Sequence, residues 1–267
     1  MLDISLEWRR TCILNVVHMT QKERADHILA VSGGAESREA AKRLIMAGQV
    51  YYETPSGQWL RVDKPGTRMD ISTPLEVRGK ERFVSRGAYK LLTVLDAFSL
   101  PVAGAVALDG GASTGGFTDC LLQHGAAKVY AVDVGHSQLH EKLRADPRVI
   151  SMEKTNLRNA PSDLLPEMVD IVTADVSFIS LTLVLPSCVR FLKSGGYVAA
   201  LIKPQFELGP EAAPKGVVRD EALRAKAVSK VTAFAEGELG LTLHGVLPAG
   251  VKGPKGNQEY MAVWRKV

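Results

Sequence analysis

From about residue 88 onward, short and nearly uninterrupted apolar runs alternate with segments whose apolar residues have helical spacing. Such runs are typical of strands buried on both faces of a sheet, and helices between them indicate a parallel arrangement. The sequence therefore predicts an α/β fold with a mostly parallel, seven-stranded sheet, in which ligands bind at the carboxyl ends of the strands. The predicted strands are 105–109, 128–134, 148–153, 169–175, 196–202, 241–247 and 259–264, and the predicted helices are 86–98, 115–124, 137–144, 179–192 and 219–238.

The first third of the chain has a different character and predicts a small α+β domain over residues 24–79. Ser37 is expected to cap a helix within 35–50, and Gly48 is expected to end it. Turn-forming residues separate three short predicted strands, at 49–53, 58–62 and 74–78. The remaining divisions are an extension over 1–23, in which Met19 offers an alternative start, a linker over 80–87 and the main domain over 88–267.

Composition limits the class of protein. With 46% hydrophobic and 23% charged residues in a chain of 267, the sequence is typical of a soluble globular protein of one or two domains. The net charge of +4 favours an anionic partner without requiring one. No apolar run approaches the ~20 residues of a membrane-spanning helix. Cys12, Cys120 and Cys188 form no CxxC pair, which indicates reduced thiols in a cytoplasmic protein.

The segment "ALDGGASTGGFTDCLL" (107–122) joins the end of a predicted strand to a helix through a glycine-rich turn. Glycines permit a sharp turn and close approach to a ligand, but nucleotide and dinucleotide sites share this pattern. A pyrophosphate at the helix N-terminus is disfavoured by adjacent acids, whereas Asp109 and Asp175 both end strands here. Acids at two strand ends favour a cationic ligand without phosphates, such as S-adenosylmethionine with its sulfonium and ammonium groups. A tight turn that only packs is the alternative.

Asp133 in "VYAVDVG" ends the next strand, 24 residues after Asp109. An acid at this spacing commonly accepts hydrogen bonds from a ribose diol, although it can also cap a helix. Asn156 follows the third strand and is predicted to lie beside the adenine. The residues predicted to bind the cofactor are Asp109, Gly111, Ser113, Gly115, Gly116, Phe117, Asp133, Asn156 and Asp175.

Four charged residues that lie far apart in the sequence are candidates for catalysis: Lys90, Asp175, Lys203 and Glu259. The ordinary alternatives are a solvated helix face for Lys90, a helix cap for Asp175 and an edge strand for Glu259. Lys203 follows five apolar residues in "YVAALIKPQFE" and precedes Pro204, which ends the strand. A charge there is costly to bury without partners, although a lysine can also extend its amine toward solvent.

The combination of "DGGASTGGFTD", "VYAVDVG", "ADVSFISL", "LIKPQFE" and "KGNQEY" resembles the TlyA family of ribosomal RNA 2'-O-methyltransferases over residues 24–267. Members of this family are also called hemolysin A. The resemblance implies an N-terminal S4-like RNA-binding domain followed by a Rossmann-like, FtsJ-like methyltransferase domain that uses S-adenosylmethionine. It also implies a cytidine target in ribosomal RNA and a Lys-Asp-Lys-Glu catalytic set, which corresponds to Lys90, Asp175, Lys203 and Glu259.

Two features of the N-terminal region depart from the family pattern. The S4-like segment usually has little before it, so the resemblance does not explain residues 1–23. The stretch "YYETPSGQW" stands where the family usually has a short Val-Asn-Gly-type turn. Both departures concern the choice of RNA target more than the chemistry.

Methyl transfer to a ribose hydroxyl is an in-line displacement that also requires removal of a proton. Alignment of the reacting atoms can supply ~7 kcal/mol or more. Lys203 is expected to be the general base, because burial, a second cation and the sulfonium all favour a neutral amine. Lys90 is expected to position the 2'-hydroxyl, and Asp175 and Glu259 are expected to orient the two amines.

No metal is expected, because only His136 and His140 have helical ligand spacing and the pair lacks the glutamate of HExxH. A ribose 2'-hydroxyl target requires RNA, and basic side chains of the N-terminal domain are expected to contact its phosphates. Ordinary solvated charges are the alternative for each of them. The predicted RNA-binding residues are Arg24, Arg38, Lys42 and Arg43, with Arg61 and Arg68 on the same proposed surface.

Three other functions are compatible with parts of the sequence. A membrane-active hemolysin would need an amphipathic or spanning segment, and none of adequate length stands out. An RNA-binding factor of the S4 type with an inactive methyltransferase domain would not need Asp109, Asp133 and the four-residue catalytic set. A small-molecule methyltransferase would have no use for an RNA-binding module.

Overall fold

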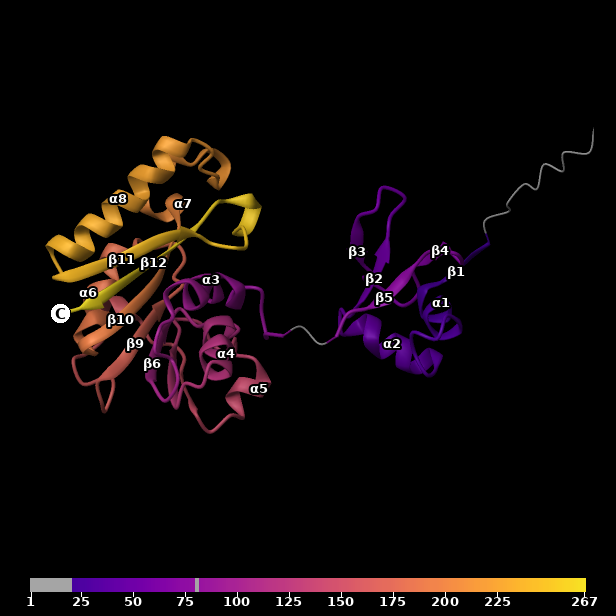
Figure 1. The fold of residues 1–267 in the computed structure, drawn as a ribbon, viewed down its shortest axis with the longest axis horizontal. Coiled ribbons are helices and arrows are strands. Elements are labelled where there is room, and N and C mark those ends of the chain that lie inside the picture. Colours follow the sequence, from indigo (N-terminus) through magenta and orange to yellow (C-terminus); the bar gives the residue numbers. More distant parts are fainter. Residues whose placement is uncertain (1–20, 80–81) are drawn as a thin grey trace, which may run out of the picture. The chain divides into compact units, whose positions relative to one another are not determined.

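The computed structural model describes residues 21–79 and 82–267. The chain divides into two compact units, with the boundary between Glu81 and Arg82 (Figure 1). Each unit has its own hydrophobic core. Of the extension predicted over 1–23, residues 1–20 lie outside the described residues.

The N-terminal unit combines two short helices with two small antiparallel sheets. The strand β1 pairs with β4, and β2 lies between β3 and β5. Both helices contribute to the core, in which Leu29, Ile45 and Val50 are fully or almost fully buried. The elements are β1 (Lys22–Arg24), α1 (Ala25–Val31), α2 (Arg38–Met46), β2 (Val50–Glu53), β3 (Trp59–Arg61), β4 (Arg68–Asp70) and β5 (Leu75–Val77).

The predicted cap of Ser37 is confirmed, because its Oγ accepts a hydrogen bond from the backbone N–H of Ala40 at 3.1 Å. The helix ends before Gly48, whose φ of +71° is the left-handed conformation that glycine adopts at low cost. The sequence did not predict α1 or the β1–β4 pair. Residues 22 and 23, which the sequence assigned to the extension, lie in β1. The S4-like character of this unit stays a prediction.

The C-terminal unit is built on a seven-stranded sheet in the order β11-β12-β10-β9-β6-β7-β8 (Figure 1). The strands β6 to β10 are parallel, and β12 is antiparallel to its neighbours β10 and β11. The predicted α/β fold with a mostly parallel sheet of seven strands is therefore confirmed. The strands are β6 (Val106–Gly110), β7 (Lys128–Val132), β8 (Val149–Met152), β9 (Val169–Ala174), β10 (Leu192–Ile202), β11 (Leu241–Pro248) and β12 (Tyr260–Lys266).

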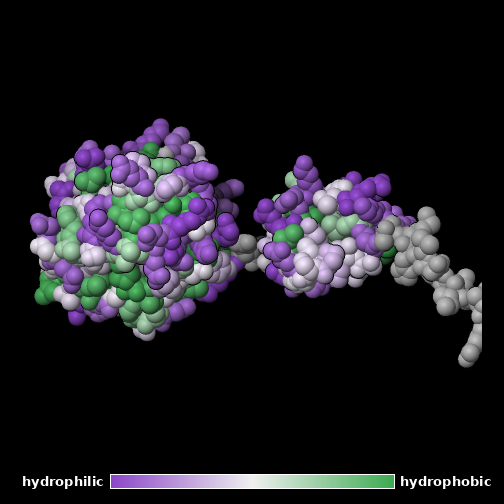
Figure 2. Space-filling model, turned by 90° about the horizontal axis from the view of Figure 1, so that it is seen from above, coloured by the Kyte–Doolittle hydropathy of each residue, from purple (hydrophilic) through white to green (hydrophobic). Residues whose placement is uncertain are grey.

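Apolar side chains of each central strand alternate between two cores, one on each face of the sheet. Ala107 and Ile171 belong to the core under α3 and α4, whereas Leu108 and Val172 belong to the core under α6 and α8. The surface in Figure 2 is mainly hydrophilic with smaller hydrophobic areas. The helices are α3 (Ala88–Phe98), α4 (Gly116–Gln123), α5 (Glu141–Arg144), α6 (Leu185–Arg190), α7 (Pro204–Glu207) and α8 (Glu221–Gly237), with 3-10 helices η1 (Leu157–Asn159), η2 (Leu181–Leu183), η3 (Pro210–Ala212), η4 (Pro214–Gly216) and η5 (Pro254–Gly256).

Two predicted helices are wrong in extent. The helix predicted over 137–144 is only α5, because the carboxylate of Glu153 accepts hydrogen bonds from the backbone N–H groups of Ser137 at 2.7 Å and Gln138 at 2.9 Å and holds them in a loop. The helix predicted over 179–192 is divided into η2 and α6. Its last residue, Leu192, already belongs to β10.

Candidate active site

The predicted catalytic residues meet at the carboxyl edge of the parallel strands. Asp175 directly follows β9 and Lys203 directly follows β10. Glu259 directly precedes β12, whose first residue pairs with the last residue of β10. Lys90 reaches the same edge from α3. The strand order reverses between β9 and β6, and this is the point at which open α/β sheets bind ligands.

The glycine-rich turn between β6 and α4 packs tightly against the loop after β9. Gly111 has a φ of +79°, and a Cβ at this position would lie 2.6 Å from the carbonyl oxygen of Asp175. Gly115 has a φ of +94°, and a Cβ there would overlap the side chain of Leu143. Only glycine satisfies both the backbone conformation and the close contact at these two positions.

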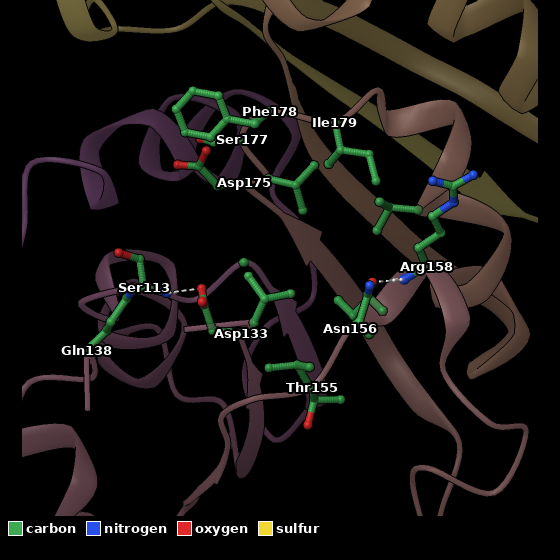
Figure 3. A pocket seen from close by; sticks show the side chains of 16 residues that line it. Ser113, Asp133, Gln138, Thr155, Asn156, Arg158, Asp175, Ser177, Phe178 and Ile179 are labelled. Atoms are coloured by element: carbon green, nitrogen blue, oxygen red, sulfur yellow. Dashed lines mark hydrogen bonds between the residues drawn. The ribbon is translucent and has the colours of Figure 1, made fainter. Parts of the chain in front are cut away.

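A cavity of about 490 Å³ opens beside this turn, and Figure 3 shows Asp133, Asn156 and Asp175 arranged around it. The backbone N–H of Ser113 donates to Asp133 Oδ2 at 2.8 Å, and that of Gly135 donates to Oδ1 at 2.7 Å. These bonds fix the carboxylate but leave lone pairs for a ligand. Asn156 Oδ1 accepts a hydrogen bond from the N–H of Arg158 at 3.0 Å.

The predicted cofactor residues do not all line this cavity. Gly111, Ser113, Asp133, Asn156 and Asp175 line it. A second, smaller cavity of about 230 Å³ is lined by Gly116 and Phe117 and shares Gly111, Ser113 and Asp175 with the first. The two cavities therefore adjoin along the glycine-rich turn and the loop after β9. Asp109 and Gly115 line neither of them.

Asp109 differs from the expectation that it faces a ligand. Its carboxylate is completely buried and accepts hydrogen bonds from Thr118 Oγ1 at 2.7 Å and Thr173 Oγ1 at 2.9 Å. Burial raises the pKa of Asp109 to about 6, against the opposing effect of these hydrogen bonds. Through these two hydrogen bonds Asp109 links β6 to α4 and β9, next to the glycine-rich turn.

A compact cluster of alternating charges lies at the wall of the second cavity, which Lys90, Asp175 and Lys203 line, with Glu259 buried against Lys90. Lys90 Nζ lies 2.7 Å from Glu259 Oε2 and 4.0 Å from Asp175 Oδ2. Lys203 Nζ lies 2.5 Å from Asp175 Oδ1 and donates a hydrogen bond to Ser177 Oγ at 2.8 Å. Apart from this ion pair, Asp175 Oδ1 has no hydrogen-bond partner among the described residues.

Burial makes this charge cluster costly. Glu259 has no exposed surface, and the side chains of Lys90 and Lys203 are only 10% and 9% exposed. Desolvation costs several kcal/mol per buried ion, and pairing rarely returns more than that cost. Stability alone therefore does not account for four charges at one strand edge. Lys90, Asp175 and Lys203 share the wall of the smaller cavity, with Glu259 buried against Lys90, and this position favours a chemical role.

Residues next to the predicted set support it, and the sequence reasoning missed them. Gln205 Nε2 donates to Glu259 Oε1 at 3.1 Å. The buried carboxylate of Glu207 binds the loop after β9, since it accepts hydrogen bonds from Ser180 Oγ at 2.5 Å and from the N–H of Leu181 at 2.8 Å. Glu207 thereby ties the segment after Lys203 to the loop that carries Asp175. The signal was present, because both residues stand in the quoted stretch "LIKPQFE".

Phe178 is an aromatic residue at the mouth of the large cavity. It is 90% exposed, has a φ of +64°, and lies 5.0 Å from the ring of Phe206 between centroids. A left-handed conformation is unusual for an aromatic residue. Together, the exposure and the conformation present a flat apolar surface beside the charge cluster.

The predicted RNA-binding residues lie in the N-terminal unit, and three of them are engaged in ion pairs. Arg24 and Arg38 lie 2.7 Å and 3.3 Å from the carboxylate of Asp26, which is buried. The hydrogen bond from Arg24 lowers the pKa of Asp26. Lys42 pairs with Glu39 at 2.6 Å, whereas Arg43 is exposed. All four keep exposed surface on α2 or at the start of α1.

Metal, thiol and membrane features are limited within residues 21–79 and 82–267. No group of three His, Cys, Asp or Glu side chains is arranged to hold a metal ion there. Cys120 and Cys188 are free, and burial raises the pKa of each to about 12, while Cys12 lies outside the described residues. Among the described helices, none combines the length and apolar character that crossing a membrane requires.

The fold and the acid-lined cavity at the glycine-rich turn define a Rossmann-like methyltransferase. The family model of the FtsJ-like methyltransferases matches residues 83–266. YqxC of Bacillus subtilis is 46% identical over 245 residues, which cover 91% of this chain and 85% of that protein. The 16S/23S rRNA (cytidine-2'-O)-methyltransferase TlyA of Mycobacterium tuberculosis is 44% identical, with coverages of 91% and 89%.

A solved structure of a hemolysin candidate from Streptococcus thermophilus is 45% identical and superposes with a TM-score of 0.70. The match covers 93% of this chain and 90% of that chain. The chain belongs to the FtsJ-like methyltransferases and, within them, to the TlyA family. The resemblance seen in the sequence motifs is thus confirmed.

Proposed function

We propose that this protein transfers a methyl group from S-adenosylmethionine to the ribose 2'-hydroxyl of a cytidine in ribosomal RNA. The main support for the proposal is that two cavities lie next to each other and share part of their walls. One presents Asp133 and Asn156, and the other gathers Lys90, Asp175 and Lys203. The activity in the name of the Mycobacterium tuberculosis relative supports the same type of substrate.

The large cavity fits S-adenosylmethionine by its chemistry. Leu157, Ile179 and Val184 offer apolar walls for an adenine ring, and the carboxylate of Asp133 has lone pairs for a ribose diol. Asp175 places negative charge where the two cavities join. When bound, S-adenosylmethionine supplies an electrophilic methyl group on a positively charged sulfur. The carboxylates of Asp133 and Asp175 beside the glycine-rich turn suit such a cation better than a pyrophosphate.

Lys203 is the proposed general base. Its amine is held at the wall of the smaller cavity by Asp175 and Ser177, so a ribose hydroxyl in that cavity would lie within reach. The neutral amine would take the hydroxyl proton as the oxygen attacks. A positioned base of this kind contributes about 10²- to 10⁴-fold to the rate.

Lys90 is proposed to donate a hydrogen bond to the same hydroxyl oxygen. Glu259 fixes its amine at 2.7 Å, and Gln205 holds the second oxygen of Glu259. The hydroxyl is thereby oriented by one amine and deprotonated by the other. Most of the remaining rate enhancement comes from alignment of the reacting atoms, which the pairing of the charged side chains supports.

Phe178 is proposed to stack on the base of the target nucleotide. Single-stranded or extruded bases bind aromatic side chains in many RNA-binding proteins. The ring of Phe178 is exposed at the cavity that would hold the cofactor. The N-terminal unit is proposed to be the S4-like module that holds the surrounding RNA through Arg24, Arg38, Lys42 and Arg43. A ribosomal substrate would place the activity in the cytoplasm.

Mapping of 2'-O-methyl groups on ribosomal RNA tests the proposal. RNA from a deletion strain, a strain complemented with the wild-type gene and a strain complemented with a Lys203→Ala gene would be compared. We expect at least one cytidine to lose its methyl group in the deletion strain and to regain it only with the wild-type gene. If no position changes, the substrate assignment is wrong, whatever the cofactor affinity of the purified protein.

A further inference from the structure

The tripeptide Pro-Lys-Gly occurs twice in the C-terminal unit, as η4 and as η5. The two copies adopt the same conformation. Lys215 and Lys255 have φ values of 56° and 59°, and the glycines that follow have φ values of 78° and 84°. Left-handed lysines are uncommon, and two identical ones in one unit form a repeated feature that the proposed chemistry does not use.

The two turns lie side by side although they are 40 residues apart in the sequence. Lys255 Nζ donates to the carbonyl oxygen of Lys215 at 3.4 Å. Asn257, which is almost fully buried, joins them more firmly. Its Nδ2 donates to the carbonyl oxygen of Gly216 at 2.8 Å, and its Oδ1 accepts from the N–H of Val218 at 3.1 Å. Together, η4, η5 and Lys252 form a surface that we call the twin turn.

The twin turn carries exposed positive charge. Lys215, Lys252 and Lys255 are all exposed, and within the described part of the chain none of them forms an ion pair with a carboxylate. The nearby Asp220 caps α8 through hydrogen bonds from the N–H groups of Ala222 and Leu223. Three ammonium groups are therefore available to an anionic partner.

The same segment packs on the catalytic cluster. Gly253 lies so close to Glu259 that a Cβ on this glycine would overlap the carboxylate. Glu259 in turn holds Lys90 at the wall of the smaller cavity. The twin turn is thus linked to the wall of the smaller cavity through Gly253, Glu259 and Lys90.

We propose that the twin turn binds phosphates of the RNA strand that flank the target ribose. The inference rests on the proposed function and adds to it a second RNA contact, in the methyltransferase unit itself. Lysines bind phosphate as point charges, and such contacts fix the register of a strand without reading its bases. Lys215 and Lys255 have the same left-handed backbone conformation, in two turns that lie side by side. This arrangement suits neighbouring phosphates of one strand.

A triple variant, K215Q/K252Q/K255Q, tests the proposal in the full-length protein with purified ribosomal RNA. We expect the KM for RNA to rise about tenfold or more and kcat to stay within about twofold. Each lost phosphate contact should reduce the slope of log K against log salt by about 0.7 to 0.9. Affinity for S-adenosylmethionine and the melting temperature should be unchanged.

Two controls accompany the triple variant. K215R/K252R/K255R keeps the charges and should retain the wild-type KM. Lys226→Gln removes an exposed lysine of α8 and should have no effect. An unchanged RNA affinity and salt slope in the glutamine variant would overturn the proposal. Loss of binding to phosphatidylserine vesicles, with RNA binding unchanged, would also overturn it and would assign the surface to a membrane.

Binding and methylation are measured separately, so the two proposals can fail independently. If the wild-type protein binds RNA through the twin turn but methylates no ribosomal RNA, the phosphate contact stands and the proposed function fails. If the wild-type protein methylates ribosomal RNA and the glutamine variant does so with the same KM, the function stands and the phosphate contact is wrong.

Discussion

The two adjoining cavities at the carboxyl edge of the sheet are built in different ways. The large one is formed by backbone turns, with Gly111 in a left-handed conformation and backbone N–H groups that fix Asp133. The small one is lined by the charged side chains of Lys90, Asp175 and Lys203 together with the glycine-rich turn, and Glu259, the partner of Lys90, is 169 residues away from it in the sequence. The glycine-rich turn marks the first cavity in the sequence as a continuous motif, although residues after β7, β8 and β9 also line it. The charges at the second cavity come together only in the folded chain.

Substitutions at the two cavities should therefore have different effects on the enzyme. Changes in the backbone turns should weaken cofactor binding, because they alter the shape of the large cavity. Changes in the charge cluster should slow the chemical step and leave cofactor affinity intact. A substitution that violates this division would show that the two cavities act as one site.

The largest expected effect comes from the charge cluster. Lys203→Ala and Lys203→Arg should each lower turnover by about 10²- to 10⁴-fold, because neither side chain can accept the proton. Single-turnover methylation measures the loss, and calorimetry should give an unchanged cofactor affinity. Lys193→Arg is the matched control, since Lys193 pairs with Asp170 at 2.6 Å and lines neither cavity. An active Lys203→Arg enzyme would remove Lys203 from the role of base.

The second prediction concerns the backbone turn. Gly111→Ala should weaken cofactor binding about 10- to 100-fold, because strain of about 1–3 kcal/mol would displace the turn from the carbonyl oxygen of Asp175. Gly104→Ala is the control, since Gly104 has a similar φ of +75° but a Cβ added there would meet no atom within 4 Å. Equal losses of cofactor affinity in the two variants would contradict the close-contact explanation.

A smaller effect is expected from the link between the two loops. Glu207→Gln should lower kcat roughly tenfold with little change in cofactor affinity. The reason is that it weakens the hydrogen bonds that Ser180 and Leu181 donate to the carboxylate, which are worth about 1–3 kcal/mol. Lys230→Gln removes only the contact of 3.6 Å with Glu207 and the bond to its carbonyl oxygen, so its kcat should fall less. A Glu207→Gln enzyme with wild-type kcat but a raised KM for RNA would place Glu207 in RNA binding instead.

The smallest effect on turnover is expected from substitution of Asp109, because its buried carboxylate affects the pH dependence of folding stability and lines neither cavity. Its pKa is raised by burial to about 6, so the folded state favours the protonated form, and stability falls as pH rises from about 4 to above 6. Asp109→Asn should remove up to about 3 kcal/mol of this pH dependence. Urea unfolding at several pH values measures it. Asp146→Asn should act in the opposite direction, because Arg148 lowers the pKa of Asp146 and its contribution is lost as pH falls.

The strands of the C-terminal unit were predictable because their apolar runs are local and continuous, as in β9 and β10. The helices near the site were less predictable, because their ends depend on residues far away in the sequence. Glu153 holds Ser137 and Gln138 out of α5, and nothing in the spacing of 137–144 reveals this. The same holds for α1, which is short and whose first backbone N–H groups, of Ala25 and Asp26, donate to the carbonyl oxygens of Thr67 and Pro65.

The candidate site divides in the same way. The glycine-rich turn and Asp133 could be found from their position after predicted strands. The burial of Asp109 could not, since its partners Thr118 and Thr173 come from a helix and another strand. Lys90 and Glu259 were candidates with ordinary alternatives, and only the resemblance to a known family grouped them into one catalytic set, because no local rule pairs residues so distant.

The position of β12 has a consequence for synthesis of the chain. This strand lies between β10 and β11 in the sheet, although it follows both in the sequence, and Glu259 directly precedes it. A growing polypeptide therefore completes β11 before the strand that joins it to the sheet has been made. Until β12 is made, β11 has no strand partner in the sheet, β10 has an unpaired edge and Lys90 lacks the carboxylate of Glu259. The enzyme can become competent only after β12 has left the ribosome, which is also its proposed substrate.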